Sequence, residues 1–129
     1  EAAPGVAVEP LGLRALWRLV SVLGFAPALH ACARDAMPVP EEGSACFSAL
    51  DGGVLCPRCA AGTVGAQLAP TDRADLAAFL STEAELPLLD DRHLASHRRL
   101  LERYVRHHLA EGAALPALAF WLERSWAAA

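Results

Sequence analysis

The feature that most constrains the fold is a segment rich in cysteine, glycine and proline that divides two helical parts of the chain. From His30 to Gly65 the apolar periodicity of the flanking sequence is lost, and all four cysteines of the protein lie there. The segment has too little apolar content to form a core of its own, so a metal or the host core must hold it. We therefore predict an inserted module of short strands and turns over residues 30–65, with Phe47 and Val54 in strands.

The spacing of the cysteines predicts a zinc site within this module. Two residues separate Cys56 from Cys59, the spacing at which two thiolates bind one tetrahedral ion. A glycine pair precedes them and allows a tight turn. Cys32 opens a second such spacing, with Asp35 where the partner cysteine would stand. Three ligands are thus expected to be Cys32, Cys56 and Cys59, and the fourth is either Asp35 or Cys46.

Other interpretations of these residues remain open at the level of the sequence. His30 is a further candidate ligand, although one residue separates it from Cys32, and buried cysteines also occur as small hydrophobes without a metal. A disulfide is disfavoured because CxxC spacing without an export signal is typical of metal sites or reduced thiols. A catalytic zinc is also disfavoured, because the His-x-Glu pair of nucleotide deaminases is absent from the chain.

Outside the module, the hydrophobic pattern predicts helices. The chain has 129 residues, 54% of them hydrophobic, and can bury one core. Residues 1–10 contain two prolines and a glycine and are predicted to be a linker. The expected helices cover residues 11–23, a segment that begins at Pro70 with Thr71 as its cap, residues 90–110 and residues 115–126. The predicted fold class is mainly α, a small helical bundle over residues 11–129 with an inserted zinc-ribbon-like module of short strands.

The helix predicted over residues 90–110 separates an apolar face from a cationic one. Its apolar side includes His97, Tyr104 and His108 at helical spacing. Arginines along the opposite side form what we call the arginine stripe, which consists of Arg92, Arg99, Arg103 and Arg106. Both histidines of the apolar side are expected to be hydrogen-bonded core residues rather than ligands.

The arginine stripe admits two interpretations. A row of arginines on a helix is often simply a solvated face. However, the net charge of the chain is −4, yet between Arg92 and His108 only Glu102 is acidic, and this asymmetry favours an anionic partner. The partner would be a phosphate backbone or an acidic peptide with an apolar end, and the peptide would also need a hydrophobic pocket. The aromatic candidates for that pocket, for which core packing is the first expectation, are Tyr104, Phe120, Trp121 and Trp126.

The sequence holds no constellation typical of an enzyme. It has no nucleophile beside a base, no phosphate-binding glycine loop and no pair of carboxylates in an apolar setting. We therefore expect a binding module without enzymatic activity. The sequence also has no run of about 18 apolar residues and no export signal, so no membrane partner and a cytoplasmic location are expected.

The order of these features resembles the C-terminal domain of the bacterial DNA repair family RecO. The similar segments are the run from Leu23 to Leu29, Cys32 with a partner three positions on, Phe47-Ser48, the run from Gly52 to Cys59, and the run from Leu101 to Leu109. The resemblance extends from about Leu11 to Trp126. At Asp35 the chain departs from the family pattern, which has a cysteine at that position.

The resemblance implies a fold and a function. The fold would be a helical domain that carries a zinc ribbon in many members and follows an N-terminal OB-fold. The function would be that of a mediator in the RecF pathway of recombinational repair, which binds DNA, anneals complementary strands and, with RecR, helps to load RecA. The implied partners are DNA, RecR and the acidic, phenylalanine-ended tail of single-stranded-DNA-binding protein, and the implied location is the bacterial nucleoid. The alternative is a zinc-ribbon protein-interaction module unrelated to repair.

Overall fold

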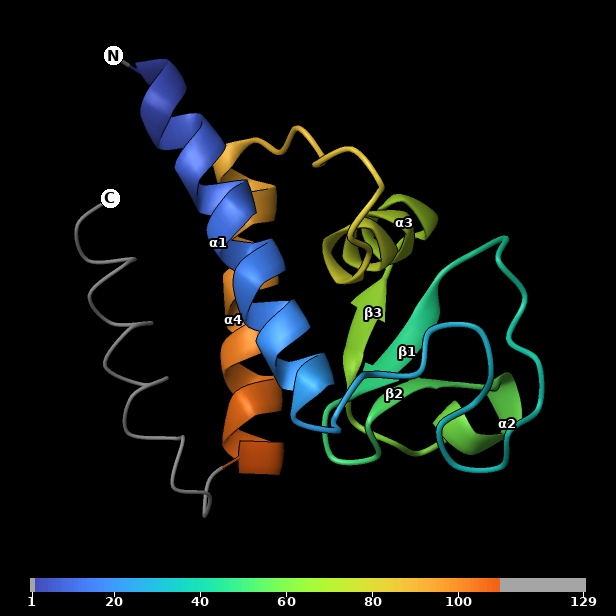
Figure 1. Ribbon diagram of the computed structural model, residues 1–129. Coiled ribbons are helices and arrows are strands. Elements are labelled where there is room, and N and C mark those ends of the chain that lie inside the picture. The colour runs from blue at the N-terminus through green and yellow to red at the C-terminus, as the bar shows by residue number, and fades with distance from the viewer. Residues whose placement is uncertain (1, 110–129) are drawn as a thin grey trace.

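The computed structural model describes residues 2–109 of the chain. The elements in chain order are α1 (Ala2–Val22), β1 (Ala45–Ser48), β2 (Gly53–Leu55), α2 (Pro57–Ala60), β3 (Ala66–Leu68), α3 (Pro70–Leu80) and α4 (Asp91–Leu109). Figure 1 shows α1 and α4 side by side, with α3 and the small sheet packed on one side of them. The helix predicted over residues 115–126, and with it Phe120, Trp121 and Trp126, lies outside the described residues.

Helix α1 begins earlier than the sequence predicts. The prediction of a linker over residues 1–10 is wrong from Ala2 onward, because α1 runs without a break from Ala2 to Val22. Pro4 lies in the first turn, where backbone N–H groups have no partner within the helix, so a proline is tolerated there. Pro10 removes one backbone hydrogen bond inside the helix without ending it.

The hydrophobic core lies where α1, α3, α4 and the sheet meet. Its centre is aromatic: the ring centroids of Trp17 and Tyr104 are 5.3 Å apart, and those of Tyr104 and Phe47 are 5.9 Å apart. The Tyr104 hydroxyl donates a hydrogen bond to the carbonyl oxygen of Phe25 at 2.7 Å. Fully buried members of this core include Leu13, Trp17, Val20, Phe47, Val54, Leu55, Leu76, Phe79, Leu101, Tyr104 and Val105. The core-packing role expected first for Tyr104 is therefore confirmed.

The sheet has three antiparallel strands in the order β2-β1-β3. Strands β1 and β2 form a hairpin in which Phe47 faces Val54, so both predicted strand positions are confirmed. Strand β3 pairs Ala45 with Leu68 and lies beyond the predicted end of the module at residue 65. The fold class is thus helical with a small sheet built into the core, and the description as mainly α holds only in part.

Gly53 allows a loop to cross the hairpin at close range. A Cβ atom at this position would lie 2.3 Å from the carbonyl oxygen of Ala28, which no side chain tolerates. Ala28 bonds to both sides of the glycine, through its N–H to the Gly52 oxygen and through its oxygen to the Val54 N–H, each at 2.9 Å. The segment that follows Ala28 is thereby held beside β2, which brings the first cysteine of the chain toward the last two.

Helices α3 and α4 begin where the sequence predicts, but the cap of α3 differs from the prediction. Helix α4 begins at Asp91, and the Asp90 carboxylate accepts a hydrogen bond from the His93 N–H at 2.8 Å. The prediction of Thr71 as the cap of α3 is wrong: Ala69 occupies that position without a side-chain bond, and Pro70 opens the helix instead. Within residues 2–109, no helix combines the length and the apolar character needed to cross a membrane.

Candidate metal centre and arginine-lined cavity

Four side chains from two turns converge beside the end of β2 and form the candidate metal centre. The Sγ atoms of Cys32, Cys56 and Cys59 and a carboxylate oxygen of Asp35 all lie within 4.8 Å of one another. Asp35 Oδ2 lies 3.5 Å from Cys56 Sγ and 3.3 Å from Cys59 Sγ. Thiolates at about 2.3 Å from one tetrahedral zinc ion are about 3.8 Å apart, so the donor set fits such an ion.

The two candidates for the fourth ligand lie at different places in the structure. Asp35 lies within the cluster, whereas Cys46 is buried in β1 and its Sγ would be 2.8 Å from a Cβ at Gly65. Burial raises the pKa of the Cys46 thiol, as expected for a small hydrophobic residue. His30 also lies apart from the cluster, exposed, with its Nδ1 3.6 Å from a carboxylate oxygen of Glu41.

The first turn presents its donors in the manner of a zinc knuckle. The N–H of Ala36 bonds to the carbonyl oxygen of Cys32 at 2.8 Å, and the N–H of Arg34 points at Cys32 Sγ at 3.4 Å. Ala36 has a φ of 67°, in the left-handed region that favours glycine. The second turn is α2, with Cys56 at its N-cap and Cys59 inside it. Each turn therefore directs two potential metal ligands to the same point.

The electrostatics of the cluster favour an anionic carboxylate. The Met37 N–H, which donates to Asp35 Oδ1 at 3.0 Å, and the neighbouring thiols hold the pKa of Asp35 well below its ordinary value. Burial, with hydrogen bonds to Cys56 and Asp35, raises the pKa of Cys59 to about 12. Burial also acts on Cys32, but N–H donors from the backbone outweigh it and lower the pKa of that thiol. A divalent cation would displace the thiol protons and offset part of the negative charge of the three thiolates and the carboxylate.

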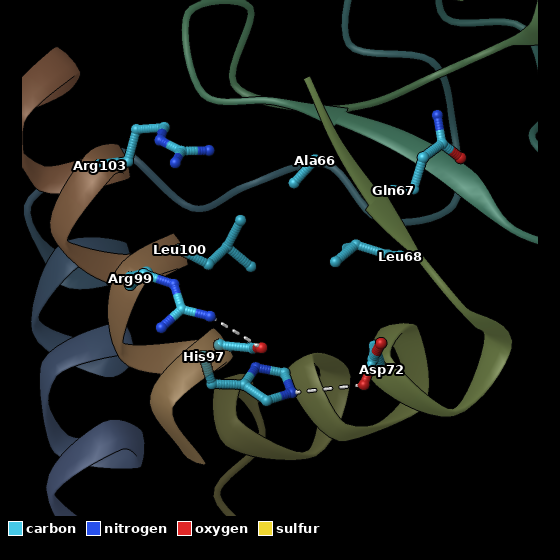
Figure 2. Close-up of a pocket in the computed structure, with 9 residues that line it drawn as sticks. Ala66, Gln67, Leu68, Asp72, His97, Arg99, Leu100 and Arg103 are labelled. Atoms are coloured by element: carbon cyan, nitrogen blue, oxygen red, sulfur yellow. Dashed lines mark hydrogen bonds and ion pairs between the residues drawn. The ribbon is translucent and has the colours of Figure 1, made fainter. Parts of the chain in front are cut away.

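A second feature is a cavity between α3, α4 and β3, which we call the arginine cavity. Its volume is about 210 Å³, and Arg99 and Arg103 line it from α4. Figure 2 shows both guanidinium groups on one side and β3 across from them. The remaining lining residues are Ala66, Gln67, Leu68, Asp72, Ser96, His97 and Leu100. All four residues of the arginine stripe are exposed, but Arg92 and Arg106 are not among those that line the cavity.

A comparison of the sequence with models of protein families shows to which family the chain belongs. The family model described as recombination protein O C terminal matches residues 2–116. The chain belongs to this family. No curated protein and no solved structure shows significant similarity to the chain. The match begins at residue 2, as α1 does, and contains both the metal centre and the arginine stripe. Membership in the RecO family indicates a role in DNA recombination and repair.

One arginine links the two halves of the metal centre in this RecO-family domain. The Arg34 guanidinium donates to Asp51 Oδ2 at 2.7 Å and to the Cys59 carbonyl oxygen at 3.2 Å. Ser48 Oγ donates to the same Asp51 oxygen at 2.7 Å, and together these donors lower the pKa of that carboxyl group. Sequence reasoning missed Arg34 and Asp51, because nothing in their spacing shows that the two turns meet.

The two core histidines of the RecO-family helix α4 differ. His108 Nε2 lies 2.5 Å from the Ala49 carbonyl oxygen, so the hydrogen bond expected for it is confirmed. For His97 the expected burial is confirmed, since the side chain is 2% exposed, but the expected hydrogen bond is not: neither ring nitrogen has one among the described residues. Its Nε2 is 3.9 Å from Asp72 Oδ1, and burial lowers the pKa of the imidazole.

Proposed function

We propose that this domain is the C-terminal part of a RecO-type recombination mediator and that it binds partners rather than catalysing a reaction. The observation that carries the proposal is the arginine cavity, where Arg99 and Arg103 stand beside the apolar side chains of Leu68 and Leu100. Two guanidinium groups next to an apolar wall suit an acidic peptide with an apolar end. The acidic, phenylalanine-ended tail of single-stranded-DNA-binding protein has this chemistry.

The arginine stripe would hold the acidic part of such a tail. Guanidinium groups bind carboxylates through paired hydrogen bonds, which favours arginine over lysine at these positions. At 1.5 Å per helical residue, the stripe from Arg92 to Arg106 spans about 21 Å. An extended peptide covers this length with about six residues. The stripe is therefore long enough to contact a short acidic segment continuously.

The cavity itself would hold the apolar end of the tail. A volume of about 210 Å³ is comparable with a single large side chain, and Ala66, Leu68 and Leu100 supply its apolar lining. Figure 2 shows Arg103 and Asp72 at opposite ends of the cavity. The Asp72 carboxylate repels other carboxylates, so the acidic residues of the peptide would lie toward Arg103.

The metal centre would serve this function as a structural clip. Cys32, Asp35, Cys56 and Cys59 would hold zinc, and the ion would lock the loop after Ala28 to the end of β2. We further propose that the whole protein binds DNA and RecR, anneals strands and assists the loading of RecA in the bacterial cytoplasm.

A peptide titration tests this proposal. The probe is a fluorescein-labelled acidic peptide that ends in phenylalanine, and the readout is fluorescence anisotropy. The double variant Arg99→Ala/Arg103→Ala should weaken binding by on the order of tenfold or more, since it removes two charge-assisted contacts. The matched variant Arg92→Ala/Arg106→Ala removes the same charge outside the cavity and should cost only about two- to threefold. Equal affinities for wild type and the first variant would refute the proposal.

Two further measurements distinguish a peptide partner from nucleic acid at the same surface. Removal of the terminal phenylalanine from the peptide should weaken its binding, because the apolar lining then loses its ligand. Binding of single-stranded DNA to the stripe would instead fall steeply as the salt concentration rises and would not compete for the apolar lining. Full competition by DNA together with indifference to the phenylalanine would favour DNA as the ligand of this surface.

A further inference from the structure

His97 is a buried polar side chain whose surroundings leave its hydrogen-bonding capacity unused. The side chain is 2% exposed, its ring lies edge-on against Phe79 with centroids 5.4 Å apart, and neither ring nitrogen has a hydrogen bond among the described residues. Buried polar groups in folded proteins are nearly always satisfied by a protein group, an ordered water or an ion, so an exception needs an explanation. The observation therefore calls for a partner at the imidazole.

Two carboxylates face this imidazole from the neighbouring helix. Asp72 and Asp75 are three residues apart on α3, so both lie on one face of that helix. Their carboxylate oxygens and a ring nitrogen of His97 all lie within 4.8 Å of one another. Figure 2 shows the His97 ring directed at Asp72, and His97 Nε2 lies 3.9 Å from Asp72 Oδ1. This distance is too long for a hydrogen bond.

The distances do suit two ligands of one cation. Nitrogen and oxygen ligands that bind one first-row metal ion at about 2.1 Å lie up to about 4.2 Å apart. The 3.9 Å between His97 Nε2 and Asp72 Oδ1 falls within this range, and a carboxylate oxygen of the half-buried Asp75 lies within 4.8 Å of a ligand atom of both residues. A cation would also relieve the repulsion between the two carboxylates and give the imidazole lone pair a partner.

We propose that Asp72, Asp75 and His97 form a second metal site, which binds a divalent first-row cation such as Mn²⁺ between α3 and α4. One imidazole and two carboxylates without a thiol select against the soft ions that the cysteine cluster favours. Water would complete the coordination on the side of the arginine cavity, which Asp72 and His97 both line. The ion would join α3 to α4. Because Asp72 also lines the arginine cavity, a bound cation would weaken the repulsion of an acidic peptide by this carboxylate, but the metal site itself does not rest on the peptide-binding function.

Electron paramagnetic resonance with Mn²⁺ on the zinc-loaded full chain tests this site, because thiolates are poor ligands for that ion. Wild type should bind about one equivalent of Mn²⁺, which lowers the resonance signal of the free ion accordingly. The variant Asp72→Asn/Asp75→Asn should bind at least tenfold more weakly. The matched variant Glu83→Gln/Glu85→Gln removes the same charge from the exposed loop after α3 and should bind like wild type. Absence of binding by wild type, or equal binding by all three proteins, would overturn the proposal.

A measurement on the unmodified chain guards against variants that fold poorly. Bound Mn²⁺ broadens NMR signals with a very steep dependence on distance, so at substoichiometric Mn²⁺ the ring signals of a directly ligating His97 should broaden most strongly. The exposed His30, which lies outside this cluster, is the internal reference. Selective broadening of His97 supports the site. Equal broadening of both rings would show only nonspecific contact and would refute it.

Discussion

The metal centre and the arginine cavity differ in how the chain brings their residues together. At the metal centre, each pair of donors is separated by two residues within one turn, so most of the geometry is local. In the cavity, the lining residues come from β3, α3 and α4, and each depends on the packing of the core behind it. The geometry of the metal centre should therefore respond to the loss of single ligands, whereas the geometry of the cavity should respond to changes in the core behind it.

The largest effect is expected for loss of a metal ligand. Cys56→Ala should lower the affinity for zinc by at least about 100-fold and the free energy of unfolding by about 3 kcal/mol or more, since the clip between the two turns is lost. Metal analysis and urea unfolding measure both quantities. Cys46→Ala is the matched control, because this thiol lies outside the cluster: it should retain zinc and lose about 1 kcal/mol. Loss of zinc in the Cys46 variant but not in the Cys56 variant would show that Cys46, and not Cys56, is a metal ligand.

A smaller effect is expected where the loop crosses the hairpin. Gly53→Ala places a Cβ atom against the Ala28 backbone and should lower the free energy of unfolding by about 3 kcal/mol, with zinc retained in the folded fraction. Gly43 also has a positive φ, but open space surrounds it, so Gly43→Ala should cost only about 1 kcal/mol. Similar decreases in the free energy of unfolding for both variants would show that the close approach of Ala28 to Gly53 does not contribute to stability.

The depressed pKa of Asp35 predicts a pH dependence in zinc-free protein. Its ordinary value is 3.8, and the folded state holds it lower, so the ionised carboxylate contributes stability above that value. This stability is lost as the pH falls from 3.8 toward the depressed pKa. Urea unfolding across this range should show a steeper acid loss for wild type than for Asp35→Asn. The same slope in both proteins would contradict the hydrogen bonding described for Asp35, and Glu83→Gln controls for a simple change of charge.

The smallest effect is expected at the turn after Asp35. Ala36→Gly should raise the free energy of unfolding by about 0.5 to 1 kcal/mol, because its left-handed φ of 67° favours glycine. Ala61→Gly provides the opposite case. Ala61 has an ordinary extended backbone, so a glycine there should lower the free energy of unfolding by giving the unfolded chain more conformational freedom. Thermal unfolding of both variants measures the contrast, and destabilisation by Ala36→Gly would argue against the knuckle geometry.

The parts of the fold that the sequence predicts are those that leave a local pattern. Cys56 with Cys59, the strand positions Phe47 and Val54, and the helix that begins near residue 90 leave such a pattern, and the described residues show a turn, two strands and a helix at these places. The choice between Asp35 and Cys46 could not be made from spacing, because it depends on which side of β1 the thiol faces. The structure brings Asp35 into the cluster and leaves Cys46 outside.

The parts that the sequence does not predict depend on contacts between distant segments. Strand β3 has three residues, too few for a period to show, and it exists because β1 offers it an edge. The ion pair of Arg34 with Asp51 and the approach of His97 to Asp72 join residues on different elements. The early start of α1 escaped prediction because Pro4 and Pro10 suggested a linker, although a proline in the first turn of a helix is harmless.

NMR mapping of the acidic, phenylalanine-ended peptide on the labelled chain would show which part of the domain binds it. We propose that the arginine cavity binds the peptide and that the metal centre has a structural role. The amide signals of residues 66–68 and 96–103 should therefore shift on addition of peptide, while those of residues 32–35 and 56–59 stay in place. Shifts concentrated at the metal centre, or no shifts at the cavity at saturating peptide, would contradict this proposal.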